Sequence, residues 1–125
     1  MGALNLENKK VLVVEDDDMS FIYLNHIFLL TGAIVVRKQT GIDAIDAFRN
    51  DPIFDFILMD IQLPDMDGVQ VTREIRKLST AVPIIAQTAS RSGLERELMI
   101  EAGCSYVLTK PFSMEQLFEV MVTYI

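Results

Sequence analysis

Carboxylate side chains gather at two points in the sequence, each directly after an apolar run. The run Lys10–Val14 is followed by four consecutive acids, which are Glu15, Asp16, Asp17 and Asp18. The run Phe54–Met59 is followed by Asp60. Short continuous apolar runs of this kind indicate strands that are covered on both faces. The acids are therefore expected to stand at the ends of two buried strands.

Two more polar groups follow expected strands in the same way. Thr88 ends the run Ile84–Gln87, and Lys110 with Pro111 comes after Tyr106–Leu108. In an open parallel sheet, sites form beyond the carboxyl ends of the strands, where the strand order reverses. If the first and third strands are neighbours, carboxylates, a hydroxyl and an ammonium group converge on one edge.

Taken singly, each of these residues has a simple structural role. Asp17 and Asp18 can cap the next helix, Thr88 is a good strand former, and Lys110 can be a solvated surface charge. Taken together they need another explanation, because two carboxylates ~5 Å apart repel by roughly 3 kcal/mol at an effective dielectric constant near 20. One or two carboxylates with water suit Mg²⁺. The cluster is interpreted as a metal site.

The elements that would position these groups alternate strictly between strand and helix. Apolar runs predict strands, with Ala33–Arg37 as the second. Capping residues, capping boxes and glycine stops predict helices, and these are expected at Met19–Leu30, Thr40–Asn50, Asp67–Leu78, Ser92–Ala102 and from Ser113 to the end. Such alternation indicates an α/β domain with a parallel sheet and right-handed crossovers. Residues 1–7 are expected to be a flexible segment, and residues 8–125 a single domain.

Composition excludes several classes of protein. The 125 residues are 50% hydrophobic, with a mean hydropathy of +0.30, which excludes disorder. A net charge of −7 argues against direct binding of nucleic acid. The single cysteine, Cys104, cannot form an internal disulfide, which favours a reducing cytoplasmic setting.

One uncharged stretch, Met19–Val36, has about the minimum length of a membrane span. Asn25 and His26 interrupt its middle, and Thr31-Gly32 divides it before the β-branched residues that follow. It is interpreted as a helix, a glycine stop and a buried strand, with no membrane insertion.

At this point the sequence resembles the receiver domain of two-component response regulators, from about Lys9 to Ile125. The resemblance is carried, in order and spacing, by Val11–Asp17, Ile57–Gly68, Gln87–Ala89 and Leu108–Phe112. It implies a flavodoxin-like, doubly wound (βα)5 fold whose five-stranded parallel sheet has the order 2-1-3-4-5.

The resemblance also implies how the site works. Asp60 would be the phosphoacceptor for a phosphohistidine of a sensor histidine kinase or a histidine phosphotransfer protein. Asp16 and Asp60 would bind Mg²⁺ directly together with the backbone carbonyl of Gln62, and Glu15 would act through water. Mn²⁺ could substitute for Mg²⁺.

Further residues would bind the phosphoryl group or respond to it. Lys110 would pair with a phosphoryl oxygen, Thr88 would donate a hydrogen bond, and the bond before Pro111 is a candidate cis peptide. The family usually has Tyr or Phe three residues before the lysine, and Val107 stands there. Tyr106 cannot replace the ring, because successive side chains of a strand point to opposite faces.

The resemblance leaves the setting open. The stretch Pro83–Ala89 resembles receivers of hybrid histidine kinases, so the domain is expected to be either such a receiver, on the cytosolic side of a membrane-bound kinase, or a free-standing regulator. A homodimer through the last two helices is a further expectation. The domain would be no enzyme beyond its own phosphotransfer and slow autodephosphorylation.

Three rival functions fit less well. A haloacid-dehalogenase-like phosphatase needs a second Asp two residues after its nucleophile, where this chain has Gln62. A Rossmann or flavodoxin-like cofactor domain lacks support, since neither a GxGxxG nor a Walker A sequence occurs. A pseudo-receiver, acting purely as an interaction module, usually lacks the acceptor, the metal acids or the lysine, and this chain has all of them.

Overall fold

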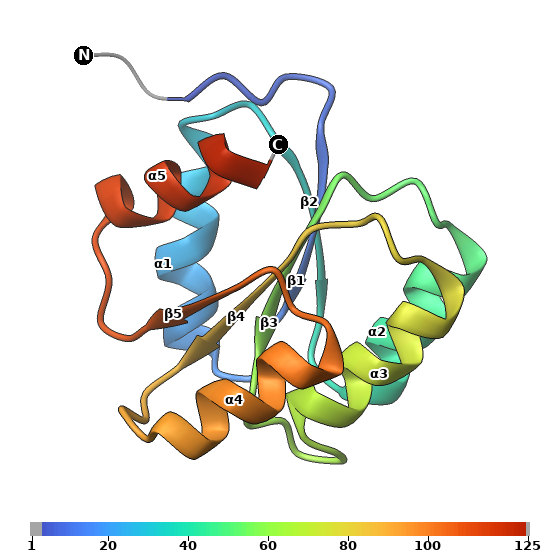
Figure 1. The fold of residues 1–125 in the computed structure, drawn as a ribbon. Coiled ribbons are helices and arrows are strands. Elements are labelled where there is room, and N and C mark those ends of the chain that lie inside the picture. The colour runs from blue at the N-terminus through green and yellow to red at the C-terminus, as the bar shows by residue number, and fades with distance from the viewer. Residues whose placement is uncertain (1–3, 125) are drawn as a thin grey trace.

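Five strands alternate with five helices in the computed structural model, which describes residues 4–124 (Figure 1). In chain order they are β1 (Lys10–Val14), α1 (Asp18–Leu29), β2 (Ile34–Lys38), α2 (Gly41–Asn50), β3 (Phe56–Asp60), α3 (Gly68–Leu78), β4 (Ile84–Thr88), α4 (Gly93–Ala102), β5 (Tyr106–Thr109) and α5 (Met114–Tyr124). Every predicted element is present, and the boundaries that could be compared differ by at most two residues.

All five strands are parallel, and their order in the sheet is β2-β1-β3-β4-β5. The expected doubly wound fold is confirmed. The chain first moves outward from β1 to β2, then returns past β1 to β3 and continues in the other direction. This reversal puts β1 and β3 side by side, with Val14 in register with Met59. The residues that follow these two strands therefore meet at one edge of the sheet.

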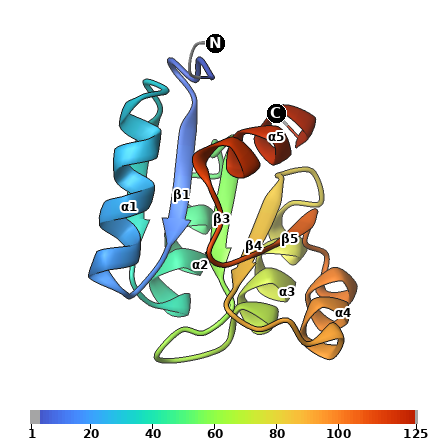
Figure 2. The ribbon, with the colours of Figure 1, turned by 90° about the vertical axis from the view of Figure 1, so that its left-hand side faces the viewer.

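Helices cover both faces of the sheet, as Figures 1 and 2 show, with α1 and α5 on one face and α2, α3 and α4 on the other. The alternation of side chains along each strand divides the core accordingly. Val11 and Val13 pack in the cluster on the α1 side, whereas Leu12 and Val14 pack in the cluster on the opposite face. Burial on both faces explains why the inner strands β1, β3 and β4 are mostly apolar.

Most helix starts follow the expected capping chemistry. Asp17 caps α1 by accepting from the Ser20 amide at 2.8 Å, and Thr40 and Asp67 cap α2 and α3 in the same way. Ser113 and Gln116 form a reciprocal capping box at α5. The box expected at Ser92 and Glu95 is the exception: within the described chain, the Ser92 side chain makes no capping hydrogen bond.

The described part of the N-terminal segment packs against the domain. Residues 1–3 of the segment expected to be flexible lie outside the described residues, but Leu6 is buried and its amide donates to the Thr31 carbonyl at 2.7 Å. In the stretch weighed as a membrane span, α1 ends at Leu29 and β2 begins at Ile34, each within one residue of the predicted position. The strand was expected to be buried, but β2 lies at the edge of the sheet, where Ile34 is exposed and the other four residues are half-buried. Between residues 4 and 124, no helix is both long and apolar enough to cross a membrane.

Candidate functional site

The acids that follow β1 and the acid that ends β3 come together at the carboxyl edge of the sheet. Glu15 and Asp60 are buried, at 0% and 8% exposure, while Asp16 is exposed. One carboxylate oxygen from each of the three lies within 4.8 Å of the others. The expected convergence therefore occurs, and its oxygen donors are the type that hard divalent cations prefer.

The carboxylate of Glu15 accepts hydrogen bonds from one backbone amide and two side chains. Its Oε2 accepts from the Asp17 amide at 3.2 Å, and its Oε1 accepts from Gln87 Nε2 at 3.1 Å and from Lys110 Nζ at 3.3 Å. Burial, reinforced by the neighbouring Asp60, raises the pKa of Glu15 from 4.5 to about 7. The raised value reflects mainly the cost of keeping a charged carboxylate in a buried position, and secondly the presence of another acid beside it.

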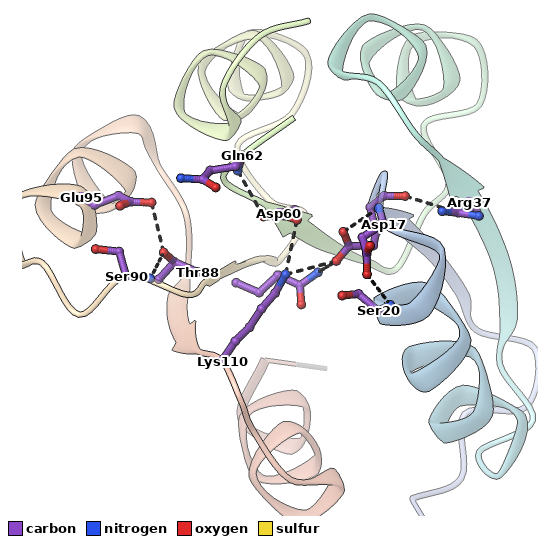
Figure 3. A network of polar contacts seen from close by, with 11 residues as sticks. Asp17, Ser20, Arg37, Asp60, Gln62, Thr88, Ser90, Glu95 and Lys110 are labelled. Carbon is purple, nitrogen blue, oxygen red and sulfur yellow. Dashed lines mark hydrogen bonds and ion pairs between the residues drawn. The ribbon is translucent and has the colours of Figure 1, made fainter. Parts of the chain in front are cut away.

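Lys110 is shared between two carboxylates. It follows β5, and its Nζ lies 3.3 Å from Glu15 Oε1 and 3.4 Å from Asp60 Oδ2 (Figure 3). The Lys110–Pro111 peptide bond is cis, as the resemblance to receiver domains implied. One ammonium group cannot offset three carboxylates, so a further cation would relieve the remaining repulsion.

A tight loop fixes Asp60 from the other side. The Gln62 amide donates to Asp60 Oδ1 at 3.1 Å, and the Gly68 amide donates to the Ile61 carbonyl at 2.6 Å. A Cβ added to Gly68 would lie 2.6 Å from the backbone oxygen of Asp60, so no larger residue fits there without a shift. The start of α3 is thus packed directly against the end of β3.

Asp65, in the same loop, caps a different helix. Its carboxylate oxygens accept from the amides of Gly41 at 2.7 Å and Ile42 at 2.9 Å, which are the first residues of α2. These bonds lower the pKa of Asp65. Sequence reasoning missed this role, because the partners lie 24 and 23 residues away and no local pattern joins them.

Thr88 ends β4 and is 5% exposed. Its hydroxyl donates to Glu95 Oε1 at 3.1 Å and accepts from the Ser90 amide at 3.0 Å. Glu95 therefore bonds to Thr88 instead of closing the box at the start of α4. In Figure 3 the pair lies to one side of the Asp60 cluster, while Lys110 extends into its centre.

A single pocket of about 470 Å³ joins these groups. The sequence-predicted residues that line it are Glu15, Asp16, Asp60, Gln62, Thr88 and Lys110.

The chain matches the family model for the response regulator receiver domain over residues 11–122. It belongs to the receiver domain family. Members of this family are in general phosphoacceptors in two-component signalling rather than true enzymes.

Related receivers occur in proteins of two kinds. The sensor histidine kinase GacS of Pseudomonas protegens is 33% identical over 127 aligned positions, which cover 98% of this chain but 14% of GacS. The polar-differentiation response regulator DivK of Brucella ovis is 30% identical over 119 positions, which cover 94% of this chain and 96% of DivK. The chain thus corresponds to a small part of one relative and to nearly all of the other.

Solved receivers have the same fold. The receiver domain of the sensor histidine kinase PA1611 from Pseudomonas aeruginosa is 33% identical, with a TM-score of 0.86 over 93% of this chain and 96% of that one, and has a magnesium ion coordinated in its active-site cleft. A response regulator from Chloroflexus aurantiacus is 26% identical, with a TM-score of 0.87 over 93% of this chain and 96% of that one.

In this receiver, the position three residues before the lysine is small and buried. Val107 is 3% exposed and packs in the cluster under α2, α3 and α4. Tyr106 is 42% exposed, and its ring lies 6.5 Å from that of Tyr124 on α5. Two bonds from Arg96 on α4, each 3.3 Å long, reach the Val107 carbonyl and the Thr109 hydroxyl. Tyr106 does not replace the missing ring.

Proposed function

We propose that this receiver is a phosphorylation-dependent switch in which Asp60 accepts a phosphoryl group from a phosphohistidine. The donor would belong to a sensor histidine kinase or a histidine phosphotransfer protein. The observation that carries the proposal is the position of Asp60: a buried carboxylate, 3.4 Å from the Lys110 ammonium, inside a cluster of acids.

In the transfer, an oxygen of the Asp60 carboxylate forms a bond to phosphorus while the bond between phosphorus and the donor's imidazole nitrogen breaks. The products are an acyl phosphate on Asp60 and a free imidazole that keeps the electron pair of the broken bond. Lys110 would turn toward a phosphoryl oxygen. Thr88 would donate its hydroxyl to another one, and to do so it must leave Glu95.

The donor set fits a divalent cation, because its three carboxylates face one another with a single ammonium among them. Asp16 and Asp60 would hold Mg²⁺ directly with the Gln62 carbonyl, and Glu15 would hold it through water. Mn²⁺ offers the same preference for oxygen. When bound, the ion supplies positive charge that offsets the charge of the transferring phosphoryl group.

The surface beside the pocket supports a protein as the donor. Met19, Ile22 and Tyr23 on α1 are exposed apolar side chains, at 74%, 60% and 46%. A second pocket of about 660 Å³ lies between α1 and Phe112, and it shares Lys110 with the acceptor pocket. A partner that brings a histidine to Asp60 would cover this apolar surface. Pairing of two copies through α4 and α5 stays an expectation.

The test is the site of phosphorylation. The protein is incubated with Mg²⁺ and acetyl phosphate or phosphoramidate, and its mass is expected to rise by ~80 Da, one phosphoryl group. Asp60→Asn should abolish the gain. Asp18→Asn removes an acid that pairs with Arg37 instead, so it should label like the wild type. Equal labelling of Asp60→Asn and wild type would contradict the assignment.

A further inference from the structure

A glutamine interrupts the most deeply buried part of the sheet. Gln87 is 1% exposed, in the strand β4, whose preceding residues Ile84, Ile85 and Ala86 are all apolar and buried. A buried amide is costly unless it is hydrogen-bonded. The Gln87 Nε2 atom donates to Glu15 Oε1 at 3.1 Å, across two intervals of the sheet, from β4 past β3 to the end of β1.

Gln87 also stands beside the phosphoacceptor. It is the register partner of Asp60 in the pairing of β3 with β4, and its carbonyl accepts from the Ile61 amide at 3.2 Å. Its backbone is therefore fixed against the strand that ends in Asp60, while its side chain reaches the neighbouring acid. A residue so placed can set the position of Glu15 relative to Asp60.

The other donors to Glu15 differ in how free they are to leave. The Asp17 amide belongs to the backbone and binds Oε2. Lys110 binds Oε1 but is shared with Asp60, and in the proposed function it turns to the phosphoryl group. Once it turns, Gln87 is the remaining donor described at Oε1. An amide also donates without charge, so it holds the carboxylate without reducing the cluster's attraction for a cation.

We propose that Gln87 is a positioning residue of this site: its amide holds the Glu15 carboxylate in place for the cation, and keeps Oε1 hydrogen-bonded when Lys110 moves to the phosphoryl group on Asp60. The second part of this inference, the role of Gln87 when Lys110 moves, rests on the proposed function. The first part, the effect of Gln87 on cation binding, does not depend on phosphorylation.

The test uses Gln87→Met, which fills similar space with apolar atoms. We expect its dissociation constant for Mg²⁺, titrated by NMR, to rise roughly tenfold, the lower end of the range for the loss of one hydrogen bond to a charged group. The rate of labelling by acetyl phosphate at saturating Mg²⁺ should fall by a similar factor. Gln70→Met, which changes an exposed glutamine on α3, is the matched control and should leave both quantities unchanged.

A double-mutant cycle separates positioning from packing. If Gln87 acts through Glu15, Gln87→Met should have little further effect on Mg²⁺ binding in a Glu15→Ala background. An equal loss in both backgrounds, or wild-type Mg²⁺ binding and labelling in Gln87→Met alone, would overturn the inference.

The wild-type protein gives a reading that does not depend on the folding of a variant. The side-chain amide resonances of Gln87 should shift during the Mg²⁺ titration together with the backbone amide of Asp17, since both bond to Glu15. Unmoved Gln87 resonances would count against the proposal. Wild-type protein that takes up no phosphoryl group would overturn the proposed function, while the Mg²⁺ titrations would still decide the role of Gln87.

Discussion

The two halves of the carboxyl edge are built differently. At the ends of β1 and β3, a backbone amide donates to each buried acid in addition to the side-chain donors: Asp17 donates to Glu15, and Gln62 donates to Asp60. At the ends of β4 and β5, side chains contribute more of the contacts. There Thr88 donates to Glu95, and Arg96 reaches Thr109, at 3.1 and 3.3 Å.

This difference separates a fixed half from a movable half. A backbone donor has its position set by the fold, so the acids near Asp60 are held where the chemistry needs them. A side chain can exchange one hydrogen-bond partner for another by changing its rotamer. This costs less free energy than moving a whole strand, which would order or displace many residues at once. Elements that move in a switch come from the less stable parts of a structure.

The largest difference between the fixed half and the movable half is expected in how two glycine substitutions change the free energy of unfolding. Gly68→Ala places a Cβ 2.6 Å from the Asp60 backbone oxygen, in the fixed half, and should lower the free energy of unfolding by about 1–3 kcal/mol. Gly93→Ala, at the start of α4, meets nothing within 4 Å and should leave stability unchanged or raise it by up to about 1 kcal/mol. Urea unfolding measures both, and equal losses would remove the contrast.

The second-largest effect is expected on the affinity for Mg²⁺. Asp16→Ala should weaken Mg²⁺ binding by about tenfold or more, the equivalent of ~1.4 kcal/mol, because it removes a carboxylate ligand. Asp18→Ala removes another exposed acid, one that pairs with Arg37 at 2.9 Å, and the Mg²⁺ affinity of this variant should stay near that of wild type. Titration by fluorescence or NMR compares them. Unchanged affinity in Asp16→Ala would take this residue out of the ligand set.

The charge on Glu15 predicts a dependence on pH. Its pKa, about 7 in the folded protein, lies above the ordinary 4.5, so its contribution to stability is complete below pH 4.5 and is lost as the pH rises through 7. Mg²⁺ should offset that loss and therefore raise the Tm more at pH 8 than at pH 5.5. Glu15→Gln should reduce the difference. A Mg²⁺ effect that is the same at both pH values would contradict the prediction.

In the movable half, Glu95→Ala should make activation easier. It removes the partner that holds the Thr88 hydroxyl, a bond of about 0.5–1.5 kcal/mol, so affinity for the phosphoryl mimic beryllofluoride should rise roughly twofold to tenfold. Glu97→Ala, an exposed acid of the same helix, is the control. Affinity that falls in Glu95→Ala would mean that this carboxylate supports the active state instead.

The smallest effect is expected across β5. Val107 has no ring to rotate and one stiff torsion, so beryllofluoride should shift the amide resonances around Thr88 and the following loop more than those of β5 and α5. Spectra with and without beryllofluoride measure this. Shifts in β5 and α5 as large as those near Asp60 would show that the movable half extends further than proposed.

The fold was largely predictable from local patterns. Apolar runs, caps and glycine stops are written in consecutive residues, so the elements could be located, and the resemblance supplied the strand order. The residues around Asp60 were predictable for the same reason, because each directly follows a strand and parallel strands end together.

The contacts between distant residues were not predictable. Gln87 and Glu15 are 72 residues apart, and nothing near either one identifies its partner. The box at Ser92 and Glu95 failed for a related reason: the pattern was present, but Thr88 gave the carboxylate a different partner. A local motif lists what a side chain can bond to, and the tertiary structure decides among the options.

The cap that Asp65 provides for α2 affects how mutational data on this protein should be read. A mutational screen scored by phosphoryl uptake would class Asp65 with the residues that take part in the phosphoryl transfer. The reason is that Asp65 shares a loop with Asp60, and the loss of Asp65 would loosen that loop. A parallel screen scored by abundance or heat resistance would rank it among the structural ones. Only residues that fail the first screen and pass the second can be assigned to the reaction.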